Sequence, residues 1–259
     1  MIHKLFHFLQ ISVRLSLKFV NKIIVIIKDE ISHDSELKTR IYSGILFGLI
    51  FIISIGYGGM VFNSMILFLA ITGFKEWFNM IDKAKEDEKR YKFWNLVGVF
   101  YITIPFAALI SIRQFNHGVL IVVWYFLIIW ATDCGAYFVG KRFGGTKLVP
   151  SISPNKTING AIGGIIASVI ASFILYSFVS KTVLFEFGFI GNMIFAAIIS
   201  ILAQCGDIFE SWIKRLFNLK DTGNFLPGHG GILDRMDSIT YSAPFLWLIV
   251  VKISESLGL

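Results

Sequence analysis

The chain has 259 residues and a formal net charge of +7, with 55% apolar and only 16% charged residues. Soluble domains carry roughly 25% charged residues, and a mean hydropathy of +0.72 does not fit a water-exposed surface. This composition excludes a disordered chain, a coiled coil and a secreted disulfide scaffold, and it predicts a polytopic membrane protein. In such a protein the excess positive charge indicates the cytoplasmic face, so no nucleic-acid partner is expected.

The N-terminal segment is basic, and no acidic residue precedes Asp29. On a helix, the side chains of His7, Arg14, Lys18 and Lys22 share one face, with apolar residues nearby, which predicts an interfacial amphipathic helix. A mitochondrial transit peptide is the alternative, and a cleaved signal peptide is not expected. The predicted organisation is a basic amphipathic extension at 1–36 followed by an integral-membrane domain at 37–259.

Uncharged stretches long enough to cross a hydrocarbon core of about 30 Å locate the membrane spans. The stretch from Ile41 to Phe74 is too long for one crossing, and the cluster Gly56-Tyr57-Gly58-Gly59 provides a turn within it. The GxxxG pattern of Gly160 and Gly164 favours close helix packing. We therefore predict an all-α polytopic membrane protein with about seven transmembrane helices, at 41–55, 60–74, 93–112, 114–132, 159–180, 187–206 and 238–251.

The distribution of Lys and Arg orients these spans, because cytoplasmic loops carry the excess of positive charge. Alternate connections hold 21 of the 24 Lys and Arg residues, and the connections on the other side hold three. The N-terminus is therefore expected in the cytoplasm and the C-terminus outside. The two longest polar segments, 133–158 and 207–237, are expected on the same cytoplasmic side.

The first polar segment, 133–158, is dense in Gly, Ser, Thr and Lys. Gly140 and Gly145 have P-loop spacing, but Thr146-Lys147 reverses the order of a Walker A motif and no strand precedes it. Such a segment can still wrap phosphates with backbone N–H and ammonium groups, whereas ordinary positive-inside charge is the alternative reading. Its candidate substrate-binding residues are Asp133, Lys141, Arg142, Lys147, Ser153, Lys156 and Thr157.

The second polar segment, 206–238, mixes acids and bases between two apolar spans, where ionisable groups are costly. If residues 206–217 continue the preceding helix, Asp207, Glu210, Ser211 and Lys214 share one face. Carboxylates suit Mg²⁺ and basic side chains suit phosphates; salt bridges that staple two helices are the alternative. The candidate catalytic residues are Asp207, Lys214, Arg215, Asp221, Asp234, Arg235 and Asp237, and the candidate substrate-binding residues are Ser211, Lys220 and His229.

Residues 206–238 resemble the signature of the phosphatidate cytidylyltransferases, the CDP-diacylglycerol synthases. The family pattern S-x-x-K-R-x4-K-D-x-G-x3-P-G-H-G-G-x-x-D-R-x-D is matched at each of its fixed positions. These positions are Ser211, Lys214, Arg215, Lys220, Asp221, Gly223, Pro227, Gly228, His229, Gly230, Gly231, Asp234, Arg235 and Asp237. His229 stands between glycines without a Cys or a second His, so it is expected to position a phosphate or cap a turn and not to bind zinc.

An upstream segment is also similar to the family, which usually has D-T-G-A-Y-x-x-G-R-x-F-G and then S-P-x-K-T-x-E-G. Three positions depart from this pattern: Cys134 replaces Thr, Lys141 replaces Arg, and Asn159 stands where Glu is common, which puts a carboxylate role there in doubt. The resemblance covers roughly residues 37–252. The matching positions are Asp133, Gly135, Ala136, Tyr137, Gly140, Phe143, Gly144, Ser153, Pro154, Lys156, Thr157 and Gly160.

The resemblance implies the Mg²⁺-dependent reaction of CTP with phosphatidate to give CDP-diacylglycerol and diphosphate, within a cytidylyltransferase domain at 37–259. It implies Asp207 and Asp234 as metal ligands, with Asp221 and Asp237 as supporting carboxylates; whether a second cation binds is left open. Phosphates would be held by Lys214, Arg215, Lys220 and Arg235. The other segment would close over nucleotide or headgroup with Lys141, Arg142, Lys147 and Lys156.

Two other functions are compatible with the same residues. One is a cytidylyltransferase or kinase for another lipid phosphate or alcohol, because the motifs contact the nucleotide and phosphates and discriminate acceptors poorly. The other is a cation-coupled transporter, although transporter sites lie near the bilayer midplane and these acids lie at span ends. The expected partners are CTP, phosphatidic acid and the lipid bilayer, with a homodimer left open. The expected location is the multi-pass plasma (inner) membrane of a bacterium, with the active site facing the cytoplasm.

Overall fold

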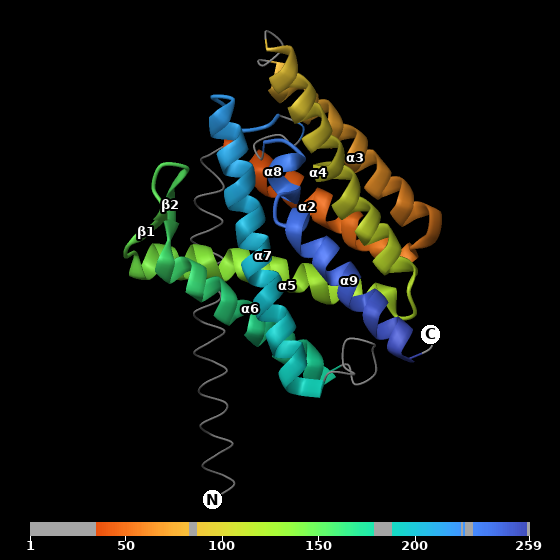
Figure 1. Ribbon diagram of the computed structural model, residues 1–259. Coiled ribbons are helices and arrows are strands. Elements are labelled where there is room, and N and C mark those ends of the chain that lie inside the picture. Colours follow the sequence, from red (N-terminus) through yellow and green to blue (C-terminus); the bar gives the residue numbers. More distant parts are fainter. Residues whose placement is uncertain (1–34, 83–86, 179–187, 224, 226–229, 258–259) are drawn as a thin grey trace, which may run out of the picture. The chain divides into compact units, whose positions relative to one another are not determined.

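The computed structural model describes residues 35–82, 87–178, 188–223, 225 and 230–257 (Figure 1). The predicted amphipathic helix near the N-terminus lies outside these residues. The chain forms two compact units, Met1–Gly48 with Leu226–His229, and Leu49–Phe225 with Gly230–Leu259. In the first unit the structure describes only the start of helix α2 (Ser35–Tyr57), so the predicted boundary at residue 36 stays a prediction.

The described residues are mostly helical, as predicted. Among the residues that the structure describes, five helices are long and apolar enough to cross a membrane, whereas the expected first span is a shorter apolar stretch, Leu46–Tyr57. The predicted last span, 238–251, lies in a longer helix, Ile239–Leu257, whose polar start and whose Lys252 and Glu255 near its end dilute its apolar character. The helices after α2 are α3 (Gly59–Ile81), α4 (Glu88–Gln114), α5 (Gly118–Phe143), α6 (Ile158–Phe178), α7 (Gly188–Leu216), α8 (Leu233–Met236) and α9 (Ile239–Leu257). Thus α3 to α7 qualify as spans, and the predicted number of seven is not confirmed.

The predicted glycine turn separates α2 from α3. Gly58 and Gly59 have φ values of 63° and 51°, a region that residues with a side chain rarely adopt. Gly58 also leaves room for Arg113 of α4, because a Cβ atom there would lie 2.1 Å from Arg113 Nη2. Arg113 Nε donates a hydrogen bond of 3.0 Å to the carbonyl oxygen of Ile55. The break in the long apolar stretch is therefore confirmed.

Helices α5 and α6 pack more extensively than any other pair in the described part of the chain. The contact is made through glycines: a Cβ on Gly135 would lie 2.7 Å from the carbonyl oxygen of Gly163, and one on Gly164 would lie 2.8 Å from that of Thr132. Small residues allow such close approach of helix backbones within a membrane. The close packing predicted from the GxxxG pattern is confirmed.

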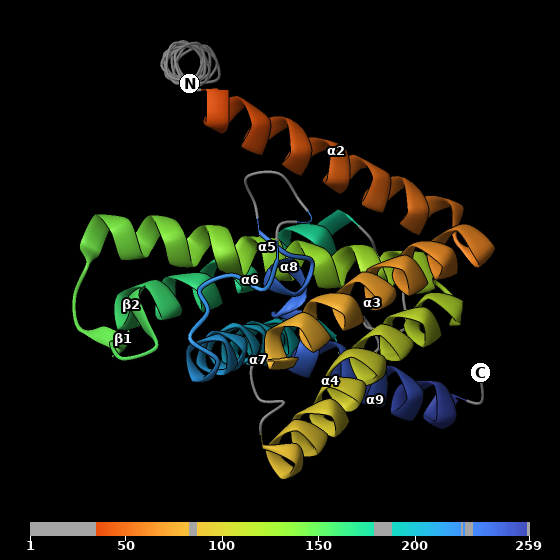
Figure 2. The same ribbon diagram turned by 90° about the horizontal axis from the view of Figure 1, so that it is seen from above.

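Helix α4 packs against α3, α5 and α9, and α7 packs against α6 and α9. The views in Figures 1 and 2 both show α3 and α4 running side by side. Buried aromatic side chains fill the space between these helices; Trp77 of α3, for example, is fully buried and donates a hydrogen bond of 3.0 Å to the carbonyl oxygen of Trp94. The outer faces are apolar, as expected for helices in lipid: Ile162, Ile166 and Ile170 line one exposed face of α6.

The connection between α5 and α6 contains a β-hairpin, which the all-α prediction missed. Strands β1 (Lys147–Val149) and β2 (Ser153–Thr157) are antiparallel, with Lys147 opposite Thr157 and Val149 opposite Ser153. Gly144 and Gly145, with φ values of 57° and 100°, end α5 and turn the chain into β1. The strands are too short and polar to show an alternating apolar pattern. Asp133 also lies inside α5 instead of in a loop, because α5 continues to Phe143.

Candidate active site

The two polar segments that were expected on one side of the membrane meet in the structure. The ammonium group of Lys156, on β2, forms an ion pair with the carboxylate of Asp207, on α7. Arg215 of α7 donates from Nε to the carbonyl oxygen of Ile152, in the hairpin turn, at 3.4 Å. The hairpin is therefore held against the carboxyl-terminal part of α7, and residues predicted from both segments contact one another.

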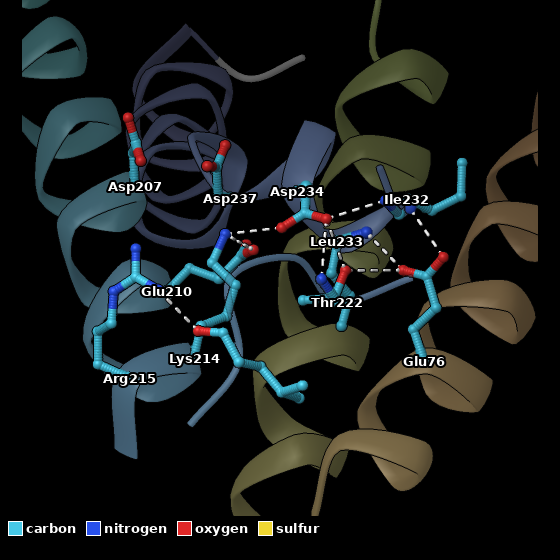
Figure 3. Close-up of polar contacts among 12 residues, drawn as sticks. Glu76, Asp207, Glu210, Lys214, Arg215, Thr222, Ile232, Leu233, Asp234 and Asp237 are labelled. Atoms are coloured by element: carbon cyan, nitrogen blue, oxygen red, sulfur yellow. Dashed lines mark hydrogen bonds and ion pairs between the residues drawn. The ribbon is translucent and has the colours of Figure 1, made fainter. Parts of the chain in front are cut away.

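Helix α7 continues through Leu216, so the predicted acidic and basic face exists. The ammonium group of Lys214 lies 2.6 Å from Oδ1 of Asp234 and 3.1 Å from Oε1 of Glu210. Lys214 is only 9% exposed and Glu210 only 1%. Figure 3 shows Lys214 between these two carboxylates. One cation shared by two buried carboxylates leaves an excess of negative charge that other donors must offset.

For Asp234 these hydrogen-bond donors lie in the loop between α7 and α8, here called the signature loop. Its Oδ2 atom accepts hydrogen bonds of 2.9 Å from the N–H groups of Thr222 and Gly231, and one of 3.1 Å from the Thr222 hydroxyl. Burial raises the pKa of Asp234, but the hydrogen bond and charge of Lys214 and these two N–H groups outweigh it and hold the pKa below its ordinary value. Asp234 is therefore an ionised carboxylate that organises the loop around it.

A second buried carboxylate, Glu76 of α3, lies on the other side of Thr222. Its Oε2 atom accepts from the Thr222 hydroxyl at 3.1 Å and from the N–H of Leu233 at 3.0 Å, and its Oε1 atom accepts from the N–H of Ile232 at 2.9 Å. Sequence reasoning missed Glu76, because the predicted span ended at residue 74 and the charges after it were assigned to a loop. The signal was a lone acid in a helix that continues beyond that span.

The glycines of the signature loop make room for these carboxylates. A Cβ on Gly231 would lie 2.3 Å from Oγ1 of Thr222 and 2.5 Å from Oε2 of Glu76, and one on Gly223 would lie 2.8 Å from Oε1 of Glu76. Gly230 has a φ of 86°, and a Cβ there would lie 2.9 Å from Oδ2 of Asp234. Gly223, Gly230 and Gly231 of the motif are therefore explained by their close approach to two carboxylates, those of Glu76 and Asp234.

The carboxyl group of Asp237 lies near enough to two other carboxylates, those of Asp207 and Asp133, to be affected by their charges. Burial raises the pKa of Asp237 well above its ordinary value, and the negative charges of Asp207 and Asp133 raise it further. Figure 3 shows Asp207 and Asp237 on neighbouring segments. Gly206 allows this approach, because a Cβ there would lie 2.3 Å from the carbonyl oxygen of Asp237. Within the described ranges, no three His, Cys, Asp or Glu side chains are already arranged to hold a metal ion.

The other predicted residues have simpler surroundings. Thr157 accepts a hydrogen bond of 3.1 Å from the N–H of Gly160 at the start of α6, so it has a structural contact. Arg235 is exposed and close enough to Asp133 to attract it. Ser153 and Ser211 are half-buried, and His229 lies outside the described residues. The exposed positions are those of Lys141, Arg142, Lys147, Lys220 and Asp221.

The described residues therefore combine a buried network of hydrogen-bonded carboxylates around Lys214 with exposed basic side chains and further carboxylates. Exposed ammonium and guanidinium groups can bind phosphate oxygens, and carboxylates that repel one another are relieved by a hard cation. This combination suits a reaction between two phosphorylated molecules, in which charge has to be neutralised before the reacting groups can meet.

Comparison with known proteins agrees with this chemistry. The sequence profile of the cytidylyltransferase family matches residues 38–111 and 91–253. A phosphatidate cytidylyltransferase from Rickettsia bellii is 36% identical over 229 residues, covering 86% of this chain and 95% of the relative. One from Rickettsia felis is 34% identical over 86% of this chain and 97% of the relative. One from Brucella suis is 36% identical over 62% of this chain and 58% of the relative.

Proposed function

The chain belongs to the cytidylyltransferase family, and we propose that it converts CTP and phosphatidate into CDP-diacylglycerol and diphosphate. The observation that carries this proposal is the ion pair between Lys156 and Asp207, since it joins the two segments that hold the phosphate-binding candidates. Relatives named for this activity align with the chain over nearly their whole length.

In the proposed reaction a phosphate oxygen of phosphatidate attacks the α-phosphorus of CTP. The new bond joins this oxygen to the α-phosphorus, and the bond between the α-phosphorus and the oxygen bridging to the β-phosphorus breaks, so diphosphate leaves. The attacking oxygen is already anionic at neutral pH, so no strong general base is needed. The main barrier is repulsion between two anions, and catalysis therefore depends on positioning and charge neutralisation.

The basic residues divide into two groups according to their surroundings. Lys214 is buried between Glu210 and Asp234, so in the proposed mechanism it acts mainly by fixing these carboxylates. Lys156 is partly exposed and can exchange the carboxylate of Asp207 for a phosphate oxygen. The remaining phosphate contacts are proposed for exposed basic side chains, namely Lys141, Arg142, Lys147, Arg215, Lys220 and Arg235.

The carboxylates fit a magnesium ion that arrives with the nucleotide. Mg²⁺ in such sites is usually held by one or two carboxylates together with substrate phosphates, so a complete protein cage is not required. Burial raises the pKa of Asp237 and the negative charges of Asp207 and Asp133 raise it further, and this proximity supports Asp207 and Asp237 as the holders, with Asp133 nearby. For Asp234 to bind the metal as predicted, the cation would have to displace or share the donors that its oxygens already have. Bound Mg²⁺ would neutralise phosphate charge.

The proposed location is a bacterial plasma membrane with the site facing the cytoplasm. The apolar helices support a membrane location, and the relatives in the comparison are bacterial. The cytoplasmic orientation is supported by the concentration of Lys and Arg on alternate connections. Soluble CTP would then reach the site directly from the cytoplasm, and the lipid would enter from the bilayer.

A radiolabelled-CTP assay with purified protein tests the proposal. Mixed micelles containing phosphatidate, an ether-lipid phosphatidate, a polyprenyl phosphate or diacylglycerol are compared with and without Mg²⁺. We expect a lipid-soluble labelled product with phosphatidate that requires Mg²⁺ and is absent with the Asp207→Asn variant. Product with the polyprenyl phosphate alone would identify another acceptor, and no product from folded protein with any lipid would refute a cytidylyltransferase acting on these acceptors.

A further inference from the structure

Glu76 stands out among the buried charged groups, because it lies on a helix outside both motif segments and yet contacts the signature loop. It is 6% exposed, and both of its carboxylate oxygens accept hydrogen bonds from that loop (Figure 3). Two of the donors are consecutive backbone N–H groups, those of Ile232 and Leu233, at the start of α8. Glu76 therefore fixes the backbone from which Asp234, Arg235 and Asp237 extend.

The third donor connects Glu76 to Asp234. The Thr222 hydroxyl lies 3.1 Å from Oε2 of Glu76 and 3.1 Å from Oδ2 of Asp234. A hydroxyl has only one proton, so it is shared by the two carboxylates or directed to one of them at a time. Because the Thr222 N–H also donates to Asp234, the position of Thr222 determines how the Asp234 carboxylate is held.

Asp234 in turn directs Lys214. Its other oxygen, Oδ1, lies 2.6 Å from the ammonium group, which also contacts Glu210 on α7. The contacts therefore run without a break from α3 through the loop to α7. Both oxygens of the Glu76 carboxylate, where this chain of contacts begins, accept hydrogen bonds. Glu76 is therefore suited to holding other groups in place and not to contacting substrate.

The glycines of the loop provide an independent observation. Both Gly223 and Gly231 lie so close to Glu76 that a Cβ atom would come within 2.8 Å of a Glu76 oxygen. In Gly231 the same Cβ would also clash with Thr222 Oγ1, at 2.3 Å. The loop is thus shaped around a carboxylate at position 76, and not merely in contact with it.

We propose that Glu76 is a positioning residue of the reaction. It holds the start of α8 through the backbone N–H groups of Ile232 and Leu233, and it holds Asp234 through Thr222. Asp234 in turn keeps Lys214 in the geometry that the reaction requires. The inference rests on the proposed function, since the residues that it positions belong to that site. Glu76 itself contacts neither substrate nor metal in this account.

Kinetics of the full-length protein in phosphatidate micelles test the proposal. Residues that orient ligands or catalytic groups typically contribute about 10- to 100-fold to activity, so we expect Glu76→Gln to lower kcat by about that factor while KM for CTP stays within about twofold. Gln keeps one acceptor oxygen, but its NH2 group would face either the N–H of Ile232 or that of Leu233, so the full set of hydrogen bonds cannot form. Glu88→Gln is the matched control, because Glu88 is an exposed glutamate that pairs with Lys92 on α4, and it should leave kcat unchanged.

Variants of Thr222 separate positioning from simple loss of fold. Thr222→Val removes the hydroxyl, whereas Thr222→Ser keeps it, so Ser should restore most of the kcat that Val loses. If Glu76 acts through Thr222, the double variant Glu76→Gln with Thr222→Val should be no more impaired than the worse single variant. Equal activities of the Val and Ser variants, or fully multiplicative effects in the double variant, would overturn the proposal.

Hydrogen exchange gives a readout that does not depend on activity. We expect Glu76→Gln to accelerate exchange in the peptide covering residues 230–236 by at least about tenfold, while exchange in α5 and α6 stays at the wild-type rate. A kcat within twofold of wild type, or unchanged exchange in this peptide, would contradict the proposed role of Glu76. If wild-type protein forms no lipid product, the proposed reaction fails instead, and the exchange measurement still decides whether Glu76 holds the loop.

Discussion

Lys156 of β2 and Asp207 of α7 form an ion pair that joins the two polar segments of the site. The two residues come from the segments on either side of α6: Lys156 is a position of the upstream family pattern, and Asp207 lies just before the second pattern, which begins at Ser211. Both side chains are partly exposed, so solvent screens their attraction and the pair adds little stability. Its value lies in placing a cation and a carboxylate where two phosphorylated substrates have to meet.

Replacing Lys156 separates the contribution of this ion pair to activity from its contribution to stability. We expect Lys156→Ala to lower kcat/KM by at least about tenfold, because a cation is lost beside the proposed phosphate site. Unfolding free energy should change by about 1 kcal/mol or less, since exposed pairs contribute little. Activity assays and thermal unfolding in detergent measure the two effects. Lys92→Ala, which removes an exposed ion pair with Glu88 outside the site, is the matched control and should retain activity.

Replacing Asp207 by Asn and replacing Asp234 by Asn should affect the stability of the protein differently. Asp207→Asn is expected to abolish turnover and to raise the Mg²⁺ concentration needed for any residual activity, with little loss of stability. Asp234→Asn should also inactivate the protein, but it should destabilise it by about 3 kcal/mol, because it breaks a buried pair with Lys214. Chemical denaturation and Mg²⁺ titrations distinguish the two. Equal stability of both variants would argue against the structural role of Asp234.

Gly206 permits the close approach of α7 to the segment that carries Asp237. In Gly206→Ala the Cβ atom would lie 2.3 Å from the carbonyl oxygen of Asp237, a backbone atom that cannot rotate away. We expect a loss of about 1–3 kcal/mol in unfolding free energy from overpacking, together with a large fall in kcat. Gly56→Ala is the control, because no atom lies within 4 Å of a Cβ there. A Gly206→Ala variant with wild-type activity and stability would contradict the close approach.

Asn159, which departs from the family pattern, makes a hydrogen bond that an ionised carboxylate could not make. Its Nδ2 atom donates a hydrogen bond of 3.1 Å to the carbonyl oxygen of Gly144, where an ionised carboxylate has no proton to donate. We expect Asn159→Asp to speed hydrogen exchange in the hairpin and to lower activity by a few fold, as a single hydrogen bond is worth about 0.5–1.5 kcal/mol. Asn155→Asp makes the same change at an exposed position of the same hairpin and should have no effect.

The long apolar helices could be predicted from sequence because membrane crossing imposes a length and a composition on each segment. The Gly58 turn and the extension of α7 beyond Asp207 followed from local rules of the same kind. The hairpin at 147–157 could not be predicted, since its strands are held by contacts with α7 and not by an apolar pattern of their own. The N-terminal amphipathic helix stays a prediction.

The sequence by itself determined the family and a set of candidate site residues, because the fixed spacing of Asp, Lys, Arg and Gly in residues 206–238 is specific and local. Only the tertiary structure decided which of these groups touch. It placed Asp234 against Lys214 and Thr222, grouped Asp207 with Asp237 and Asp133, and brought Glu76 into the signature loop from a distant helix. The reason is physical: buried carboxylates must find donors wherever the fold supplies them, and Glu76 of α3 finds its donors in Thr222, Ile232 and Leu233, far along the chain.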